Sequence, residues 1–275
     1  MRSTEEKRRD FHRLHERGCF AIPNPWDIGT AKYLQHLGFK AIATTSAGFA
    51  FSRGLSDGSV KRDDMLAHIR ELVEPTDIPV NADFENGYAD DPNWCAENAR
   101  LCAETGVAGL SVEDTTDQKD KNLYDVDLAV ERIHAVREAL HDTGVLLVGR
   151  AEGFLVGREK INEVIKRLVA YSDAGADCLY APGFKERDQI KAIVEAVAPK
   201  PVNILIGGAV GLTMRDAAEL GVRRVSVGGA FARAGWGGFI RSAKELLEKG
   251  TFDELKNAAS YDELQELFRP DRAEG

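Results

Sequence analysis

Hydrophobic residues along the chain form short runs that are separated by longer, charged segments. Charged residues enter these runs mainly at their ends, and the runs span residues 19–23, 41–46, 79–85, 109–114, 146–152, 178–182, 201–206 and 224–229. A short, nearly uninterrupted apolar run is typical of a strand that is buried on both faces, as in a parallel sheet. The pattern therefore predicts eight parallel strands.

The segments between the runs have helical periodicity and residues that begin or end helices. Asp91 and Pro92 suit a helix N-cap and first turn, and the helix that they begin is expected to end at Gly106. A second helix is expected over about 126–142. Eight strands that alternate with helices predict an α/β fold, the (β/α)8 TIM barrel. A doubly wound open sheet is the alternative, although no GxGxxG motif follows the first strand.

The chain continues after the eighth strand for longer than one barrel helix requires. Residues 231–268 predict two or three helices, with breaks at Gly250 and near Ser260. We expect a single barrel domain over residues 1–275 with a C-terminal helical extension at about 236–270. The extension either packs on a neighbouring subunit or covers its own barrel.

Composition narrows the function classes. The chain has 36 Lys and Arg against 45 Asp and Glu, a net charge of −9 without a basic run, which argues against nucleic-acid binding. No apolar stretch approaches the ~20 residues that cross a bilayer, and the N-terminus lacks a signal-peptide core. Four scattered cysteines favour neither a disulfide framework nor a zinc site, so we expect a cytoplasmic protein. All six histidines fall in predicted helices, which argues against a histidine metal site.

Carboxylates gather at the predicted ends of the third and fourth strands, where barrels of this kind build their active sites. Asp83 and Glu85 are two residues apart on one strand and are expected to face the same side, with Glu113 at the same height on the next strand. Such carboxylates repel one another unless a proton or cation intervenes, and oxygen ligands without His or Cys favour Mg²⁺ or Mn²⁺. The other interpretation is that these acids cap helices or pair with Arg and Lys.

A cation also stands at a strand end. Arg150 has a planar set of donors that suits a substrate carboxylate or phosphonate. The alternative is a structural ion pair with Glu152 or Asp114.

Two backbone features are candidates for anion binding. Ser46 and the residues after it form either a small anion-binding nest or an ordinary turn. Gly207-Gly208 and Gly228-Gly229 follow strands seven and eight, where many barrels bind phosphate, although glycine pairs also relieve tight turns.

Five segments, in order along the chain, resemble the isocitrate lyase/phosphoenolpyruvate mutase superfamily. They read NPWDIGTAKYLQHLGFKAIATTSAG, VNADFENGYADDP, SVED, GRAEG and PVNIL. The second is the most specific, because it is similar to the acidic metal-binding strand of that family.

The resemblance implies a Mg²⁺-dependent enzyme that makes or breaks a C–C or P–C bond beside a carboxylate, through the enolate of a 2-oxo acid. It implies Asp83 as the direct metal ligand, with Glu85, Glu113 and Asp57 acting largely through water. The implied catalytic residues are Arg150, Glu113 and Asp57, and the implied substrate-binding residues are Ser46, Ala47, Gly48, Asp83, Arg150, Tyr180 and Asn203. It also implies a homo-oligomer, a dimer or tetramer, whose C-terminal helices swap between subunits.

The chain departs from the family pattern at three strands. In the metal-binding strand the first residue is Asn81 and the second acid is Glu85 rather than Asp. Lyases of the family carry a K-[KR]-C-G-H loop after strand four, whose Cys supplies a proton, whereas residues 115–125 here read TTDQKDKNLYD. Tyr180 stands where mutase-type members have His. We therefore expect a lyase without a strong proton donor, which cleaves or decarboxylates a small 2-oxo or 2-hydroxy dicarboxylate resembling oxaloacetate. The alternatives are a P–C bond hydrolase or mutase acting on phosphonopyruvate or phosphoenolpyruvate, and a non-catalytic protein that binds a 2-oxo acid.

Overall fold

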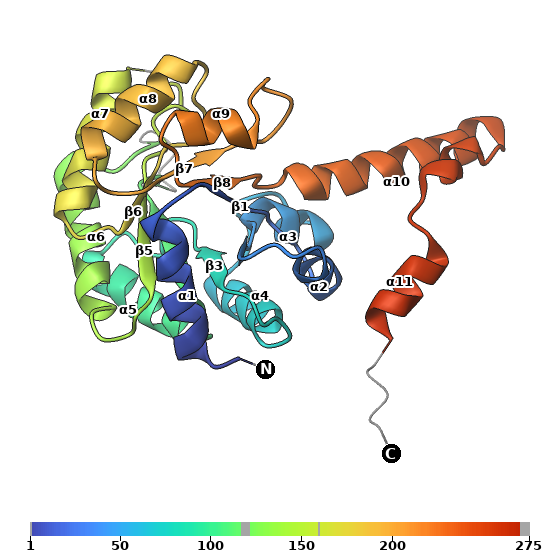
Figure 1. Ribbon diagram of the computed structural model, residues 1–275, viewed down its shortest axis with the longest axis horizontal. Coiled ribbons are helices and arrows are strands. Elements are labelled where there is room, and N and C mark those ends of the chain that lie inside the picture. The colour runs from blue at the N-terminus through green and yellow to red at the C-terminus, as the bar shows by residue number, and fades with distance from the viewer. Residues whose placement is uncertain (1, 117–121, 159, 270–275) are drawn as a thin grey trace.

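The computed structural model describes residues 2–116, 122–158 and 160–269 (Figure 1). Eight parallel strands follow one another in the order β1-β8-β7-β6-β5-β4-β3-β2. The Ala43 N–H donates to the Pro23 carbonyl over 3.0 Å, which links the two edges of the sheet into a barrel. The strands are β1 Phe20–Ile22, β2 Ile42–Ala43, β3 Val80–Asp83, β4 Gly109–Glu113, β5 Leu146–Arg150, β6 Cys178–Tyr180, β7 Val202–Leu205 and β8 Arg224–Ser226.

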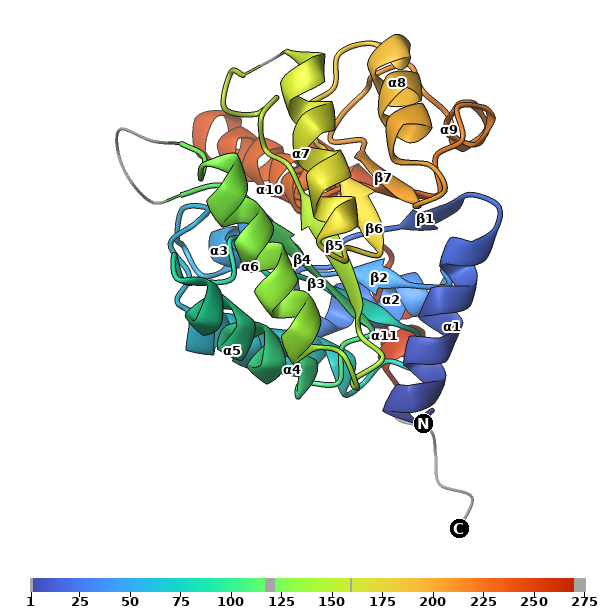
Figure 2. The ribbon, with the colours of Figure 1, turned by 90° about the vertical axis from the view of Figure 1, so that its left-hand side faces the viewer.

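Helices surround the strands, and Figure 2 shows α6 and α7 across the outside of the sheet. The alternation confirms the predicted (β/α)8 barrel and excludes the open sheet. The helices are α1 Thr4–Glu16, α2 Ile28–His36, α3 Ser46–Ser52, α4 Arg62–Val73, α5 Pro92–Ala103, α6 Val126–Ala139, α7 Ile161–Asp173, α8 Arg187–Val197, α9 Met214–Glu219, α10 Ala230–Lys249 and α11 Tyr261–Phe268, with a 3₁₀ turn η1 at Asp253–Asn257.

Local sequence signals set the helix ends. The Asp91 side chain accepts hydrogen bonds from the N–H groups of Asn93 and Trp94 at 2.9 and 3.2 Å, as expected of an N-cap. Gly106 and Gly175 have φ of 91° and 102°, the left-handed conformation that ends a helix before the next strand.

Alternate residues of each strand enter two separate cores. Leu147 packs outward against the helices, whereas its neighbour Leu146 packs inside the barrel with Ile22 and Val148. Helix α1 closes the N-terminal end by inserting Phe11 into the barrel. A Cβ on Gly109 would lie 2.6 Å from the Phe11 ring, so only glycine leaves room for this helix.

The C-terminal segment leaves the barrel. Helix α10 begins directly after β8, projects away from the sheet and ends at Gly250, and α11 turns back beyond it (Figure 1). The predicted breaks are confirmed, because Gly250 has the left-handed φ of 68° and the Ser260 side chain caps α11. Apolar side chains on this arm remain exposed, including Phe239, Leu247 and Phe252. Among the described helices, none is long and apolar enough to cross a membrane.

His68 on α4 is buried and neutral. Five of the six histidines lie in helices as expected, and His141 follows α6. The His68 ring stacks on Phe49 with centroids 3.7 Å apart, and its Nε2 has no hydrogen-bond partner within the described residues. Burial lowers the pKa of His68 to about 4, against a smaller opposing effect of Asp27.

We predict that His68 makes the fold less stable in acid. Between about pH 6.5 and 4 the unfolded chain binds a proton at this residue and the folded chain does not, so stability falls as pH falls through that window. The loss approaches about 3 kcal/mol, at roughly 1.4 kcal/mol per pH unit. Urea unfolding at several pH values should show a flatter acid limb for His68→Phe. His36→Gln on the exposed end of α2 is the control, and equal acid limbs in all three proteins would contradict the prediction.

Candidate active site

A cavity of about 200 Å³ opens at the C-terminal ends of the strands. Its walls include many of the residues singled out by the sequence: Ser46, Ala47, Asp57, Asp83, Arg150, Tyr180 and Asn203. A larger cavity of about 550 Å³ lies between α2 and α11, but its walls are mainly apolar and it lies away from these polar groups. The chemistry is therefore expected in the smaller cavity.

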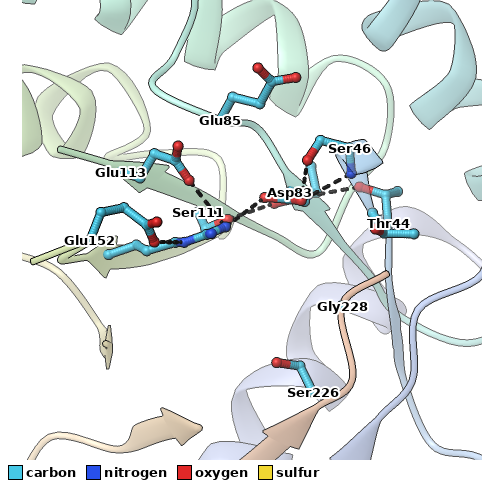
Figure 3. Close-up of polar contacts among 12 residues, drawn as sticks. Thr44, Ser46, Asp83, Glu85, Ser111, Glu113, Glu152, Ser226 and Gly228 are labelled. Atoms are coloured by element: carbon cyan, nitrogen blue, oxygen red, sulfur yellow. Dashed lines mark hydrogen bonds and ion pairs between the residues drawn. The ribbon is translucent and has the colours of Figure 1, made fainter. Parts of the chain in front are cut away.

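The Arg150 guanidinium is the centre of the polar contacts. Its Nη1 lies 3.1 Å from an oxygen of Asp83 and 3.1 Å from an oxygen of Glu113, and its Nε lies 2.5 Å from Glu152 (Figure 3). It also lies 5.0 Å from the centre of the Tyr180 ring. The ion pair with Glu152 that the sequence left open is therefore present, within a larger set of three carboxylates around one cation.

Three carboxylates exceed the charge of one guanidinium. Burial raises the pKa of Glu113 to about 8, Arg150 opposes this, and Glu152 and Asp83 raise it further. Burial also raises the pKa of Glu152. Three ionised carboxylates around one guanidinium would leave an excess of negative charge at the mouth, so a proton on Glu113 or an added cation is favoured there.

Asp83 joins β3 to the start of α3. Its Oδ2 accepts hydrogen bonds from both the backbone N–H and the hydroxyl of Ser46, each at 3.0 Å. The Gly48 N–H donates to the Thr45 hydroxyl, which caps this helix. Two of the N–H groups expected to bind a substrate carboxylate are thus engaged within the protein.

Gly48 serves packing, and the described walls of the cavity do not include it. A Cβ at this position would lie 2.6 Å from the Thr45 side chain, 3.0 Å from Trp26 and 3.2 Å from Ala232 of α10. The glycine therefore allows α3 to lie close beneath α10. Its expected contact with substrate finds no support in this geometry.

The expectation that Glu85 faces the same side as Asp83 is wrong. Strand β3 ends at Asp83, and Glu85 has φ of 47°, so the two-residue alternation of an extended strand no longer applies. The Glu85 carboxylate accepts a hydrogen bond from the Tyr88 hydroxyl at 2.9 Å and points away from the Arg150 cluster in Figure 3. Its implied role as a metal partner is untested.

Asp57 reaches the cavity from the loop after α3. Loss of hydration raises the pKa of Asp57, and the Asp83 carboxylate on the same cavity wall raises it further. Asn203 lies deeper and is buried, where its amide nitrogen donates to the Ser226 hydroxyl at 3.1 Å.

The backbone N–H groups near Gly228 that could bind a phosphate already donate to a side chain of the protein. The Asn24 side-chain oxygen accepts from the N–H groups of Val227 and Gly228 at 3.0 and 2.8 Å. Gly207 and Gly208 lie outside the described cavity walls. The phosphate-binding alternative therefore finds no support in this geometry.

The sequence analysis missed several polar residues that line the cavity, among them Ser111, Arg224 and Ser226. Each lies on a strand, and Ser111 precedes Glu113 by two residues. Applying the two-residue alternation backward from the strand ends finds Ser111 and, from Gly228, finds Ser226 and Arg224.

Comparison with known proteins agrees with this geometry. The family model described as phosphoenolpyruvate phosphomutase matches residues 11–247. The chain belongs to the isocitrate lyase/phosphoenolpyruvate mutase superfamily. A crystal structure of a lyase/mutase-type protein from Burkholderia cenocepacia J2315, whose name leaves the reaction open, has a TM-score of 0.94 and 46% identity, with 98% of each chain covered.

Relatives with a named reaction are more distant. The 2-methylisocitrate lyase of Salmonella typhimurium is 28% identical over 73% of this chain and 72% of its own. The oxaloacetate decarboxylase of Paraburkholderia xenovorans is 26% identical over 81% of this chain and 75% of its own. The superfamily is one of enzymes, and its lyase and mutase chemistry is the class of function to which this chain belongs.

In this superfamily member the two acids of the SVED segment lie on opposite sides of the sheet. Glu113 faces the mouth, whereas the buried Asp114 accepts hydrogen bonds from Arg167 at 2.9 Å and from the Tyr171 hydroxyl at 2.6 Å. Asp114 also accepts from the backbone N–H of Glu152 at 2.8 Å. This outer network therefore holds Glu152, whose carboxylate accepts a hydrogen bond from Arg150.

We predict that the Arg167–Asp114 pair is essential for stability. Arg167→Met leaves a buried carboxylate without its cation, which costs about 3–5 kcal/mol. Arg137→Met breaks a more exposed pair with Asp177 and should cost about 1 kcal/mol or less. Urea unfolding of both variants measures the difference, and equal losses would show that burial does not govern the pair.

Proposed function

We propose that this protein is a Mg²⁺-dependent lyase that acts on a small 2-oxo or 2-hydroxy dicarboxylate through an enolate, by C–C cleavage or decarboxylation. The observation that carries the proposal is the position of Arg150, which lies between Asp83 and Glu113 at the wall of a small polar cavity. A guanidinium in this place can pair with a substrate carboxylate, while the acids beside it attract a cation.

The donor set suits a hydrated magnesium ion. The described residues contain no compact group of three acidic, His or Cys ligands. Mg²⁺ commonly keeps several waters and takes only one or two carboxylates, which fits Asp83 as the direct ligand with Asp57 and Glu113 nearby. A bound divalent ion supplies Lewis-acid stabilisation of the negative charge that develops on the keto oxygen.

The residues around the cavity would divide the remaining work. Arg150 would orient the substrate carboxylate, and Ser46 and Ala47 line the cavity at the start of α3, where Ser46 holds Asp83 in place. Burial raises the pKa of Tyr180 to about 12, so its hydroxyl keeps its proton at neutral pH. The 115–125 segment lacks the Cys of the family lyases, and its residues 117–121 lie outside those described. Water is therefore our proposed proton source, which favours decarboxylation of an oxaloacetate-like substrate.

We predict that the protein converts oxaloacetate to pyruvate faster than the spontaneous rate, and only with Mg²⁺ or Mn²⁺. Asp83→Asn should lower the metal-dependent rate by about 100-fold or more, because it removes the charge that attracts the ion. A coupled pyruvate assay measures both proteins. Asp63→Asn, an exposed acid on α4, is the control and should retain the wild-type rate.

Full activity of Asp83→Asn would overturn the metal assignment, and no metal-dependent acceleration would overturn the decarboxylase proposal. The alternative of a P–C bond hydrolase or mutase draws support from the family model that the chain matches. Phosphate release from phosphonopyruvate, or its conversion to phosphoenolpyruvate, would favour that alternative. Metal-dependent binding of 2-oxo acids without turnover would favour a non-catalytic protein.

We also propose that the chain forms a homo-oligomer, a dimer or tetramer, through the arm formed by α10, η1 and α11. Leu247 is 86% exposed, and Phe239 and Phe252 are each 62% exposed. Several large apolar side chains exposed on one segment are typical of a protein–protein contact. A neighbouring copy would bury these side chains.

The four free cysteines favour a reducing compartment, and we propose the cytoplasm as the location of this protein.

We predict that light scattering after size exclusion finds an oligomer for the wild type. Phe239→Glu combined with Leu247→Glu should give a smaller species, because it places charge in the apolar contact. Lys249→Glu on the same helix is the control and should leave the mass unchanged. A monomeric wild type would contradict the prediction.

A further inference from the structure

Arg224 is a buried cation at the floor of the cavity. It is the first residue of β8, whereas Arg150 is the last residue of β5, and Arg224 is only 3% exposed. Its Nη1 lies 3.5 Å from His15 on α1, the helix that closes the N-terminal end of the barrel. The cavity therefore has one arginine near its mouth and another below it, and both contribute to its walls.

The groups around Arg224 are neutral acceptors. Its Nε donates to the Asn203 side-chain oxygen at 2.9 Å, and its Nη1 donates to the Asn81 side-chain oxygen at 3.2 Å. His15 Nδ1 lies 2.8 Å from the Phe11 carbonyl, and burial followed by Arg224 lowers the pKa of His15 to about 3. His15 is therefore neutral and offers Nε2 as an acceptor. No carboxylate within the described ranges pairs with Arg224.

One end of the guanidinium is left without an acceptor. Arginine has five N–H donors, and the three contacts above use those on Nε and Nη1. The Nη2 group donates to no residue in the described part of the chain. A buried charge that has only neutral partners is costly, so a site of this kind gains stability from an anion.

The cavity size limits the anion. The cavity of about 200 Å³ has room for a small anion such as a four-carbon dicarboxylate. Ser111 and Ser226 line the cavity as well and are uncharged, so the described walls around Arg224 are free of the acidic excess of the mouth.

We propose that Arg224 forms a second anion subsite, which binds the distal carboxylate of a substrate whose 2-oxo or 2-hydroxy acid end is held near Arg150. This inference rests on the proposed function for the location of the first end. This subsite would make the protein bind short dicarboxylates more tightly than monocarboxylates that have the same 2-oxo or 2-hydroxy acid group. The selectivity arises because a monocarboxylate leaves the Arg224 charge uncompensated.

Malate and lactate test the subsite, because both are 2-hydroxy acids and only malate has the distal carboxylate. Calorimetric titration of the wild-type protein with Mg²⁺ present should find malate bound at least 10-fold more tightly than lactate. Arg224→Met should weaken malate binding at least 10-fold and leave lactate binding unchanged. Arg224→Lys keeps the positive charge and should retain part of the preference for malate over lactate. This variant also tests the subsite if Arg224→Met does not fold.

Arg223→Met is the matched control, because Arg223 precedes β8 and donates to the Gly18 carbonyl rather than into the cavity. It should leave the preference for malate unchanged. Three results would overturn the subsite. They are equal affinity of the wild type for malate and lactate, no binding of either acid, and an unchanged ratio of the two affinities in both Arg224 variants. The oxaloacetate assay tests the proposed reaction separately from the subsite. A preference for malate without turnover of oxaloacetate would support the subsite and refute the decarboxylase proposal. Turnover of oxaloacetate without a preference for malate would support the reaction and refute the subsite.

Discussion

The contact of one guanidinium with three carboxylates organises the mouth of this barrel. Arg150 joins Asp83 on β3, Glu113 on β4 and Glu152 just after β5. The charges do not balance, and burial holds the pKa of Glu113 at about 8. An excess of carboxylates of this kind would favour the divalent cation that we propose, and Arg150 lies where it could pair with a substrate carboxylate. The structure of the mouth and the proposed chemistry therefore both depend on the excess of carboxylates over guanidinium groups.

The barrel interior separates charge along its axis. The acidic excess lies at the C-terminal ends of the strands, and Arg224 lies below it among Asn203, Asn81 and His15, all neutral. Interiors of such barrels are usually filled with branched apolar side chains. Here the layer beneath the mouth is polar, and the apolar filling is confined to residues such as Leu146 and Val148 together with Phe11 from α1. A small polar cavity remains for this reason.

Adjacent residues at the end of β4 serve different purposes in this fold. Glu113 faces the cavity, and Asp114 faces the helices, where Arg167 and Tyr171 hold it. Because Asp114 also accepts the Glu152 backbone N–H, the packing of α7 on the sheet determines where Glu152 meets Arg150. The site is thus supported from the outer face of the barrel.

The sequence by itself determined the eight strands, the caps such as Asp91 and Gly250, the family, and the grouping of Asp83, Glu113 and Arg150, because these follow from local periodicity and from the meeting of parallel strand ends. Only the tertiary structure decided the rest. Glu85 leaves the cluster because β3 ends two residues earlier, Gly48 meets α10 rather than the cavity, and Arg224 gains its place at the floor from side chains of β3, β7 and α1. Where a strand stops and which distant groups surround a buried charge depend on packing between segments far apart in the chain, and no local pattern encodes them.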